Sequence, residues 1–343
     1  MKALVYELNE KLSVQERPKP VPEAGEALVK VRLAGICGSD IVAWQGGFAR
    51  IVKPVVLGHE FVGVVEEVRA AGSPFAPGDR VAVEPLVSCG ECEPCRKGHY
   101  HVCRRLGLIG LDRDGGFTSY VRVPVERLHR IPESMPLERA VFAEPVAVAV
   151  HMLRRSGLVF GQTAAIFGAG PIGVLVAMVA REAGASRIAI SDINEHRLRR
   201  VRELGFHAVD ARLENSAELM KSHFGEEGAD VSFEVAASPH SLDAAIRVAK
   251  IRGVVLAGGM FKKPPTIDLQ QVTMREQTVV GTRVYNFDDF AAALRLLERP
   301  DFPVESLVSR VVRVEDAIEQ GFMAIRSGED LMKVLIRFDD DNL

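Results

Sequence analysis

Short apolar runs, several of them with a period of two, fill the first part of the chain and are separated by glycine and proline. Residues 1–147 contain, among others, the runs EALVKVRLAG, EFVGVVEEV, DRVAVEPL and FTSYVRV. Runs of this length between turn residues are typical of β-strands. The pattern therefore predicts an irregular, β-rich domain over residues 1–147.

The rhythm changes in residues 148–284, where apolar strand-like runs alternate with helical segments. The expected strands are TAAIFGAG, RIAISD, HAVD, ADVSFEVA, GVVLAGG and QTVVGTR, and the expected helices include PIGVLVAMVAREAG and INEHRLRRVRELG. This order predicts a parallel, doubly wound sheet and an α/β fold class. The alternation stops after Tyr285. We expect residues 285–343, with a helix at FDDFAAALRLLE and a final strand at MKVLIRF, to return to the first domain and complete it.

Length and composition agree with two domains and exclude several classes of protein. The 343 residues are too many for one ordinary core, and 47% of them are hydrophobic. A net charge of −3 leaves no basic footprint for a nucleic acid. No apolar run reaches the roughly 18 residues of a membrane span, and the N-terminus MKALVYELNE lacks the apolar core of a signal peptide. We therefore expect a cytoplasmic enzyme with no membrane or nucleic-acid partner, whose thiols stay reduced.

Four of the five cysteines lie in the stretch CGECEPCRKGHYHVC. Disulfides are disfavoured in a reducing compartment, and cysteines so close together would close very small loops. Tetrahedral zinc fits the spacing better than a redox C-x-x-C pair or four unliganded surface thiols. Because four protein ligands leave no open position, we expect a structural zinc in a lobe of about residues 86–106. Its ligands are Cys89, Cys92, Cys95 and Cys103.

The glycine-rich turn FGAGPIG follows an apolar strand and opens an apolar helix. In a dinucleotide-binding turn, Gly168 permits the tight bend, Gly170 lets the backbone approach the pyrophosphate, and Gly173 lets the helix pack closely. Ile172 lies inside the same motif, and we expect it to contact the cofactor. The match alone is weak because such turns are common, but an acidic residue at the end of the next strand strengthens it.

That acidic residue is Asp192, which can accept hydrogen bonds from the adenosine ribose and would repel a 2′-phosphate. It therefore favours NAD over NADP. A purely structural interpretation makes it the N-cap of the following helix. Arg197, in that helix, is a nearby cation that could tolerate a phosphate, so it weakens the preference for NAD.

A second set of possible metal ligands lies in the first domain, in GICGSD, LGHEFVG and FAEPVAVAVH. Taken singly, Cys37, His59, Glu60 and Glu144 have ordinary explanations as a buried thiol, a core histidine and solvated carboxylates. Beside a nucleotide-binding fold and a closed zinc site, the mixed set indicates a catalytic zinc with room for water or substrate.

The motifs together resemble the zinc-containing medium-chain dehydrogenase/reductase superfamily, and within it the polyol branch that includes sorbitol, threonine and butanediol dehydrogenases. The motifs GICGSD, GHEFVGVVEEV, the four-cysteine lobe, DGGFTSYVRVP, EPVAVAVH and GAGPIG stand in the family's order over essentially the whole chain. The resemblance implies a GroES-like catalytic domain wrapped from both termini around a Rossmann domain. It also implies two zinc ions per subunit, NAD, and a homodimer or homotetramer formed through the edge strand near TVVGTR.

Residue roles follow from the resemblance. Cys37 and His59 match catalytic zinc ligands, and Glu60 matches a carboxylate that binds the metal in sorbitol-type members. Glu144 matches a glutamate that contacts the zinc or its water, so either glutamate could be the third ligand. Asp40 matches the carboxylate that orients the ligand histidine, and Ser39 matches the hydroxyl that touches the reacting alcohol oxygen.

The resemblance also implies a reaction. Zinc would act as a Lewis acid on the substrate oxygen, and hydride would pass to the nicotinamide, whose carboxamide should rest on the backbone near Gly258. Binding both glutamates would make the zinc site negative, so we expect one of them to bind at a time, or a cation to compensate. Arg283 is our candidate for that cation or for a contact with substrate or cofactor; otherwise it is an ordinary surface arginine.

One position departs from many relatives, which carry a proton-relaying histidine where this chain has Val42. The relay would then need Ser39, the cofactor ribose and water, or Glu144 as a base. Trp44 and Phe48 either shape the entrance to the site or simply pack.

We expect oxidation of a secondary alcohol of a polyol, sugar or sugar acid to a ketone. An L-threonine 3-dehydrogenase or a butanediol dehydrogenase is the alternative within the class. Outside it, we consider a zinc-free quinone reductase or a non-catalytic zinc- and nucleotide-binding regulatory protein.

Overall fold

The computed structural model describes residues 1–338. The chain forms two compact units, which are described separately below. Unit 1 consists of Met1–Glu144 and the segment that starts at Asn286, and unit 2 is Pro145–Tyr285. The predicted domain limits of residues 1–147, 148–284 and 285–343 stay a prediction.

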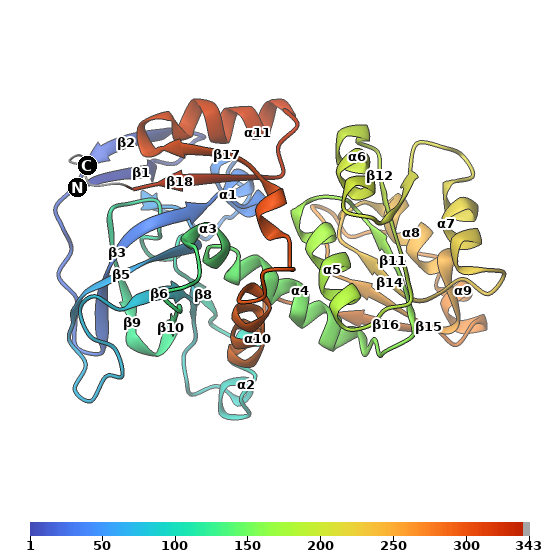
Figure 1. The fold of residues 1–343 in the computed structure, drawn as a ribbon, viewed down its shortest axis with the longest axis horizontal. Coiled ribbons are helices and arrows are strands. Elements are labelled where there is room, and N and C mark those ends of the chain that lie inside the picture. Colours follow the sequence, from blue (N-terminus) through green and yellow to red (C-terminus); the bar gives the residue numbers. More distant parts are fainter. Residues whose placement is uncertain (339–343) are drawn as a thin grey trace. The chain divides into compact units, whose positions relative to one another are not determined.

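Unit 1 is built on a seven-stranded sheet in the order β10-β6-β5-β3-β18-β17, with β9 also paired to β3. Its long apolar strand β3 pairs antiparallel with β5, β9 and β18. Strands from the first and the last part of the sequence therefore lie in one sheet (Figure 1). The strands are β3 (Glu26–Gly35), β5 (Glu60–Val68), β6 (Arg80–Val83), β9 (Tyr120–Pro124), β10 (Leu128–Arg130), β17 (Val308–Arg313) and β18 (Lys333–Arg337).

Two smaller sheets complete the strands of unit 1. One holds β1 (Lys2–Tyr6), β2 (Leu12–Glu16) and β4 (Val55–Val56), and the other holds β7 (Leu86–Val87) and β8 (Gly107–Leu108). The described α-helices of this unit are short apart from α10, and are α1 (Gly38–Trp44), α2 (Glu93–Arg96), α3 (Leu137–Ala140), α10 (Phe287–Leu297) and α11 (Ala324–Ser327). This β-rich architecture confirms the predicted fold of the first domain.

Unit 2 holds a six-stranded parallel sheet in the order β13-β12-β11-β14-β15-β16. This is the doubly wound order of a dinucleotide-binding fold and confirms the prediction. The strands are β11 (Thr163–Phe167), β12 (Arg187–Asp192), β13 (His207–Asp210), β14 (Ala229–Glu234), β15 (Ala249–Ala257) and β16 (Thr278–Gly281). The strands β11 and β14 are buried almost completely, as expected for a sheet that is covered on both faces.

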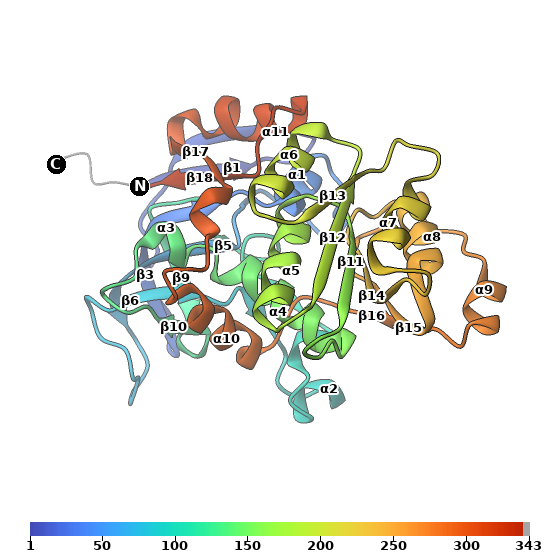
Figure 2. The same ribbon diagram turned by 45° about the vertical axis from the view of Figure 1, so that its right-hand side comes forward.

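Helices cover this sheet on both sides. Figures 1 and 2 show α5 on one side of the sheet, and α7 and α8 on the other. The helices are α4 (Ala143–Ser156), which spans the limit between the units, α5 (Pro171–Glu182), α6 (Glu195–Glu203), α7 (Ser216–Phe224), α8 (Pro239–Val248) and α9 (Leu269–Met274). Within residues 1–338, we find no helix with the length and apolarity that a membrane crossing needs.

Candidate catalytic and cofactor sites

Three of the predicted zinc ligands come together at one end of the large sheet of unit 1. Cys37 is the N-cap residue of α1, His59 directly precedes β5, and Glu60 is the first residue of that strand. One donor atom from each lies within 4.8 Å of the others. His59 and Glu60 are buried and Cys37 is half-buried, so the set can hold a metal and leave one side open.

The neighbours of His59 are the two polar residues predicted beside it. The imidazole Nδ1 lies 3.4 Å from Oδ1 of the fully buried Asp40, and Nε2 lies 3.3 Å from Ser39 Oγ. Asp40 also accepts a hydrogen bond of 2.9 Å from the backbone N–H of Cys37. Asp40 therefore orients both a thiol ligand and an imidazole ligand, as expected of a carboxylate behind a metal site.

The electrostatics of His59 favour a cation. Burial opposes the charged imidazolium, but the negative charges of Asp40 and Cys37 outweigh burial and raise the pKa of His59 well above its ordinary value. The same charges attract a divalent metal, which replaces the proton because the ligand imidazole must be neutral. The thiolate, imidazole and carboxylate donors and their charge thus fit a catalytic zinc.

The structure adds one residue that the sequence did not indicate. Lys333, at the start of β18, reaches both carboxylate oxygens of Glu60, at 2.9 Å and 2.7 Å. Lys333 is 4% exposed and Glu60 1% exposed. Burial opposes the charge of Lys333, but Glu60, Cys37 and Glu144 outweigh it and raise its pKa. A lone lysine in the apolar run MKVLIRF was the available signal, because buried lysines are rare unless they are paired.

The remaining predicted residues do not join the close set of three donors. Glu144 is buried in the first turn of α4 and does not belong to the close set of donors formed by the described residues. Arg283 is exposed and belongs to unit 2, and the cation that pairs with Glu60 is Lys333. Trp44 packs edge-on against Phe322 in the core of unit 1, so packing explains it.

The four remaining cysteines converge as predicted, and in the described chain none of the five cysteines forms a disulfide. The Sγ–Sγ distances include 3.4 Å between Cys92 and Cys95 and 3.9 Å between Cys89 and Cys95. Four sulfurs at about 2.3 Å from one zinc would be about 3.8 Å apart, so the cluster fits the ion. Backbone N–H groups of Cys92 and Glu91 lower the pKa of Cys89 to about 6, whereas burial and the neighbouring thiols raise the pKa of Cys95 to about 12. Cys89 is therefore the thiol of this pair that ionises more readily.

A buried polar network anchors this zinc lobe to the rest of unit 1. Tyr100, between the third and fourth cysteines, donates a hydrogen bond of 2.8 Å to Glu84. Glu84 is fully buried and also pairs with Arg127 at 2.9 Å, while His129 lies 3.3 Å away. Burial, then the carboxylate of Glu84, raises the pKa of Tyr100, so its hydroxyl remains a donor.

The glycine-rich turn of unit 2 has the geometry of a dinucleotide site. Gly168 adopts φ +116°, which side-chain-bearing residues rarely adopt. A Cβ on Gly173 would lie 1.8 Å from the carbonyl oxygen of Gly168, so only glycine lets α5 approach the turn so closely. Gly170 is the N-cap of α5, and a Cβ there would meet Arg197 only at 3.9 Å. Ile172 lies in the first turn of α5.

Asp192 ends β12 beside this turn and is 8% exposed. Its Oδ2 accepts a hydrogen bond of 2.7 Å from the backbone N–H of Ala169 and lies 3.7 Å from Arg197 Nη1. The N-cap of α6 is Asn194, whose side chain accepts two backbone N–H groups, so the capping interpretation of Asp192 is wrong. Asp192 instead ties the strand end to the glycine-rich turn.

Gly258 follows β15 and donates a hydrogen bond of 2.8 Å to the backbone carbonyl of Glu234, at the end of β14. Gly168, Asp192 and Gly258 therefore stand at the carboxyl ends of parallel strands of one sheet. Ligands bind at this edge in doubly wound folds, and the turn geometry fits a dinucleotide.

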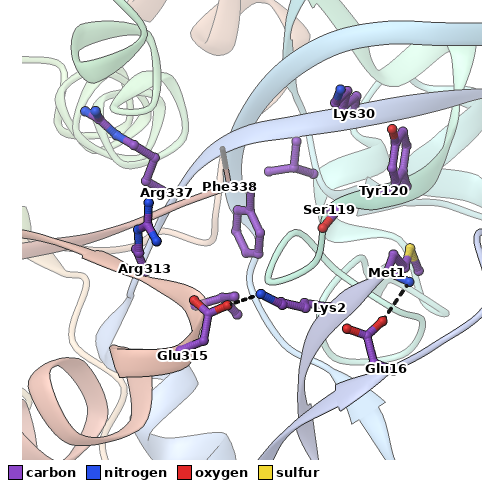
Figure 3. Close-up of a pocket in the computed structure, with 12 residues that line it drawn as sticks. Met1, Lys2, Glu16, Lys30, Ser119, Tyr120, Arg313, Glu315, Arg337 and Phe338 are labelled. Carbon is purple, nitrogen blue, oxygen red and sulfur yellow. Dashed lines mark hydrogen bonds and ion pairs between the residues drawn. The ribbon is translucent and has the colours of Figure 1, made fainter. Parts of the chain in front are cut away.

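Figure 3 shows the side chains that line a separate hollow on unit 1, none of which belongs to the sites described above. The volume of this hollow is about 240 Å³. Among the residues that line the hollow, the N-terminal ammonium of Met1 pairs with Glu16 at 3.1 Å, and Lys2 pairs with Glu315. These charges are satisfied within the hollow, so we assign it no role in the reaction.

Two family models match the chain. Residues 23–133 match the alcohol dehydrogenase GroES-like domain, and residues 171–299 match the zinc-binding dehydrogenase domain. The chain belongs to the zinc-containing medium-chain dehydrogenase/reductase superfamily. Within it the chain belongs to the polyol branch, and it is an oxidoreductase of the alcohol dehydrogenase type that uses zinc and a nicotinamide dinucleotide.

Two relatives illustrate the branch. A probable D-xylulose reductase A of Aspergillus niger is 33% identical over 338 residues, which cover 95% of this chain and 94% of the relative. A 2-dehydro-3-deoxy-L-galactonate 5-dehydrogenase of Pseudoalteromonas atlantica is 34% identical over 337 residues and covers 98% of each chain.

Solved structures agree with this assignment. The 2R,3R-butanediol dehydrogenase of Bacillus subtilis has a TM-score of 0.92 and 32% identity, over 98% of this chain and 99% of that one. An alcohol dehydrogenase of Escherichia coli in complex with NADH has a TM-score of 0.91 and 30% identity, and a putative zinc-binding dehydrogenase of Sinorhizobium meliloti bound to NADP has 0.92 and 32%. Both cover 98% of this chain and 99% of their own.

Proposed function

We propose that this protein oxidises a secondary alcohol of a polyol, sugar or sugar acid to a ketone and transfers the hydride to NAD. The observation that carries the proposal is the buried set of Cys37, His59 and Glu60 in an alcohol dehydrogenase fold. Relatives named for xylulose and for a deoxygalactonate favour a sugar-derived substrate.

In this proposal Cys37, His59 and Glu60 hold the catalytic zinc, which supplies Lewis acidity toward the substrate oxygen. Asp40 keeps the imidazole of His59 in its ligating orientation, which the distance of 3.4 Å supports. Ser39, 3.3 Å from the imidazole, is the hydroxyl placed to receive the alcohol proton. Glu144 is a nearby base for passing that proton to water.

For the cofactor, we propose that Gly168, Gly170, Ile172 and Gly173 hold the pyrophosphate and that Gly258 receives the nicotinamide. Asp192 supports NAD over NADP, because a carboxylate opposes a 2′-phosphate. Arg197 Nη1 lies 3.7 Å from Asp192 Oδ2, and its positive charge would weaken the preference for NAD. Arg283 stays a candidate contact, and a cytoplasmic location stays a prediction.

A vicinal diol is the second candidate substrate, because butanediol dehydrogenase of Bacillus subtilis has nearly the same fold. The deciding experiment is a substrate panel of xylitol, sorbitol, sugar acids, 2,3-butanediol and threonine, each with NAD and with NADP. We expect NADH formation with a polyol or sugar acid at least about tenfold more efficient, in kcat/KM, than with threonine.

Metal analysis separates the proposal from a non-catalytic role. The wild-type protein should contain about two zinc ions per chain. Cys37→Ala should lose one of them together with activity, while the matched control Cys103→Ala should disturb the other ion. One zinc in the wild-type protein and no turnover across the panel would instead favour a binding or regulatory protein.

A further inference from the structure

We propose that Lys333 is a positioning residue that shares the carboxylate of Glu60 with the catalytic metal, and that Gly35 is the opening in the sheet that lets the two side chains meet. The inference rests on the proposed function, because it assumes a catalytic metal at Cys37, His59 and Glu60. It adds a fourth residue, from the far end of the sequence, to that site.

Strand pairing brings the two charges together. Gly35, at the end of β3, pairs with Glu60 in β5 on one side and with Leu335 in β18 on the other. Directly paired residues share a face, and so do residues two apart on one strand. Glu60 and Lys333 therefore point to the same face, with the residue between them on β3 lacking a side chain.

The space over Gly35 is occupied by the carboxylate. A Cβ at Gly35 would lie 2.4 Å from Glu60 Oε2, closer than such atoms approach. Any larger residue would force the carboxylate away from its present place. The backbone of Gly35 is not in the left-handed region, so the close approach, not the conformation, explains the glycine.

The hydrogen bonds of Lys333 are fully assigned. Its three N–H donors have three acceptors: the two oxygens of Glu60 and the carbonyl of Ile36 at 3.3 Å. Each carboxylate oxygen keeps a lone pair for a metal. Glu60 can thus bind the ion while the lysine withdraws part of its negative charge.

The charges around the metal explain why the pairing of Lys333 with Glu60 would affect the reaction. Zinc with the Cys37 thiolate, neutral His59 and the Glu60 carboxylate is formally neutral, and nearby Glu144 makes the surroundings negative. Lys333 offsets that excess charge. A less negative site favours loss of the proton from the substrate alcohol, and a shared carboxylate leaves the open side of the metal to the substrate.

The test replaces Lys333 by methionine and reads the metal directly. With cobalt(II) in the catalytic site, Lys333→Met frees Glu60 to bind fully, so we expect a changed visible spectrum and about tenfold slower loss of cobalt to a chelator. The pH midpoint of polyol oxidation should rise by about one unit. Lys333→Arg should restore all three readouts toward wild type, and the matched control Arg337→Met, on the same strand, should alter none.

Faster cobalt loss from Lys333→Met with an unchanged spectrum would overturn the inference, because it would mean that Lys333 only supports the fold. If Lys333→Met does not fold, the cobalt spectrum of the double variant E60Q/K333M is compared with that of the wild type instead, since this variant removes both buried charges. Its spectrum should show the loss of a carboxylate ligand, and an unchanged spectrum again contradicts the inference.

Gly35→Ala tests the opening while keeping every charge. It should change the cobalt spectrum, and an unchanged spectrum would reject the role of Gly35. The spectra and chelator rates need no substrate. If the protein oxidises no alcohol of the panel but shows these spectral and chelator shifts, the proposed function is wrong and this inference stands. If it oxidises a panel alcohol but shows none of the shifts, the inference is wrong and the proposed function stands.

Discussion

At the scale of single residues, Asp192, which we propose discriminates between cofactors, is also part of the local structure. Its carboxylate holds the backbone N–H groups of Ala169 and Asn194 at 2.7 Å and 2.8 Å. A residue that only discriminated between cofactors would not need these bonds. The same side chain therefore fixes the glycine-rich turn and, in the proposed function, would oppose a 2′-phosphate.

We predict that Asp192→Asn shifts the ratio of kcat/KM for NADP to that for NAD upward by about tenfold or more, because it removes a charge while keeping one acceptor. Steady-state kinetics with both cofactors measure the ratio. Asp210→Asn is the control, since Asp210 ends the neighbouring strand β13 but pairs with exposed Arg212. Equal shifts in both variants would contradict the prediction.

Lys333 shows why one functional residue escaped prediction. The ligands Cys37 and His59 stand in local motifs, whereas Lys333 and Glu60 are 273 residues apart. Their contact depends on β18 pairing with β3, which no local pattern encodes. The sequence suggested Arg283 for this charge because it follows the last strand of unit 2, but that position says nothing about which cation a carboxylate in unit 1 contacts.

At the scale of elements, the zinc lobe is attached by side chains as well as by its metal. Tyr100 projects from the lobe to Glu84, and Arg127 stacks on the Tyr100 ring with its guanidinium carbon 4.5 Å from the ring centre. The lobe is therefore held in two ways: by the zinc site of its four cysteines, and by the contacts of Tyr100 with Glu84 and Arg127.

Tyr100→Phe should weaken the attachment of the lobe by about 1.5 to 3 kcal/mol, because a hydrogen bond to a buried carboxylate is lost. We expect faster release of the lobe zinc to a chelator and faster proteolysis within residues 86–106. Tyr120→Phe, at the hollow of Figure 3, serves as the control. Identical zinc release from wild-type and Tyr100→Phe protein would exclude this support.

Element prediction succeeded where burial makes a pattern clear. The runs EALVKVRLAG and EFVGVVEEV became β3 and β5 with those limits, because both strands are largely buried. In the return segment α10 and β18 were predicted, but β17 was not. Its sequence VSRVVR is half exposed, so alternation was too weak to separate it from a loop.

At the scale of the whole molecule, the sheet of unit 2 ends in an open edge strand. β16 pairs only with β15 in the described chain, and its Thr278 and Val279 are exposed. Exposed apolar edges favour pairing with another strand. The predicted homodimer or homotetramer would use this edge.

Val279→Lys should therefore lower the oligomeric state by at least one step, because a charged side chain would be placed in the apolar contact. Light scattering during size-exclusion chromatography gives the mass. Ile251→Lys, at an exposed apolar site outside β16, is the control. An unchanged mass for Val279→Lys, or a monomeric wild-type protein, would contradict this interface.

The pairing of Glu60 with Lys333 also has a consequence for biosynthesis. A chain made at about 5 to 20 residues per second emerges with the two residues separated by roughly 14 to 55 seconds, since 273 positions lie between them in sequence number. During that interval Cys37, His59 and Glu60 have been synthesised, but Lys333, the cation that pairs with Glu60, has not. A nascent chain that captured a metal then would hold it through an unshared carboxylate, and the docking of β18 would convert an early, tightly held ion into one that is ready for turnover.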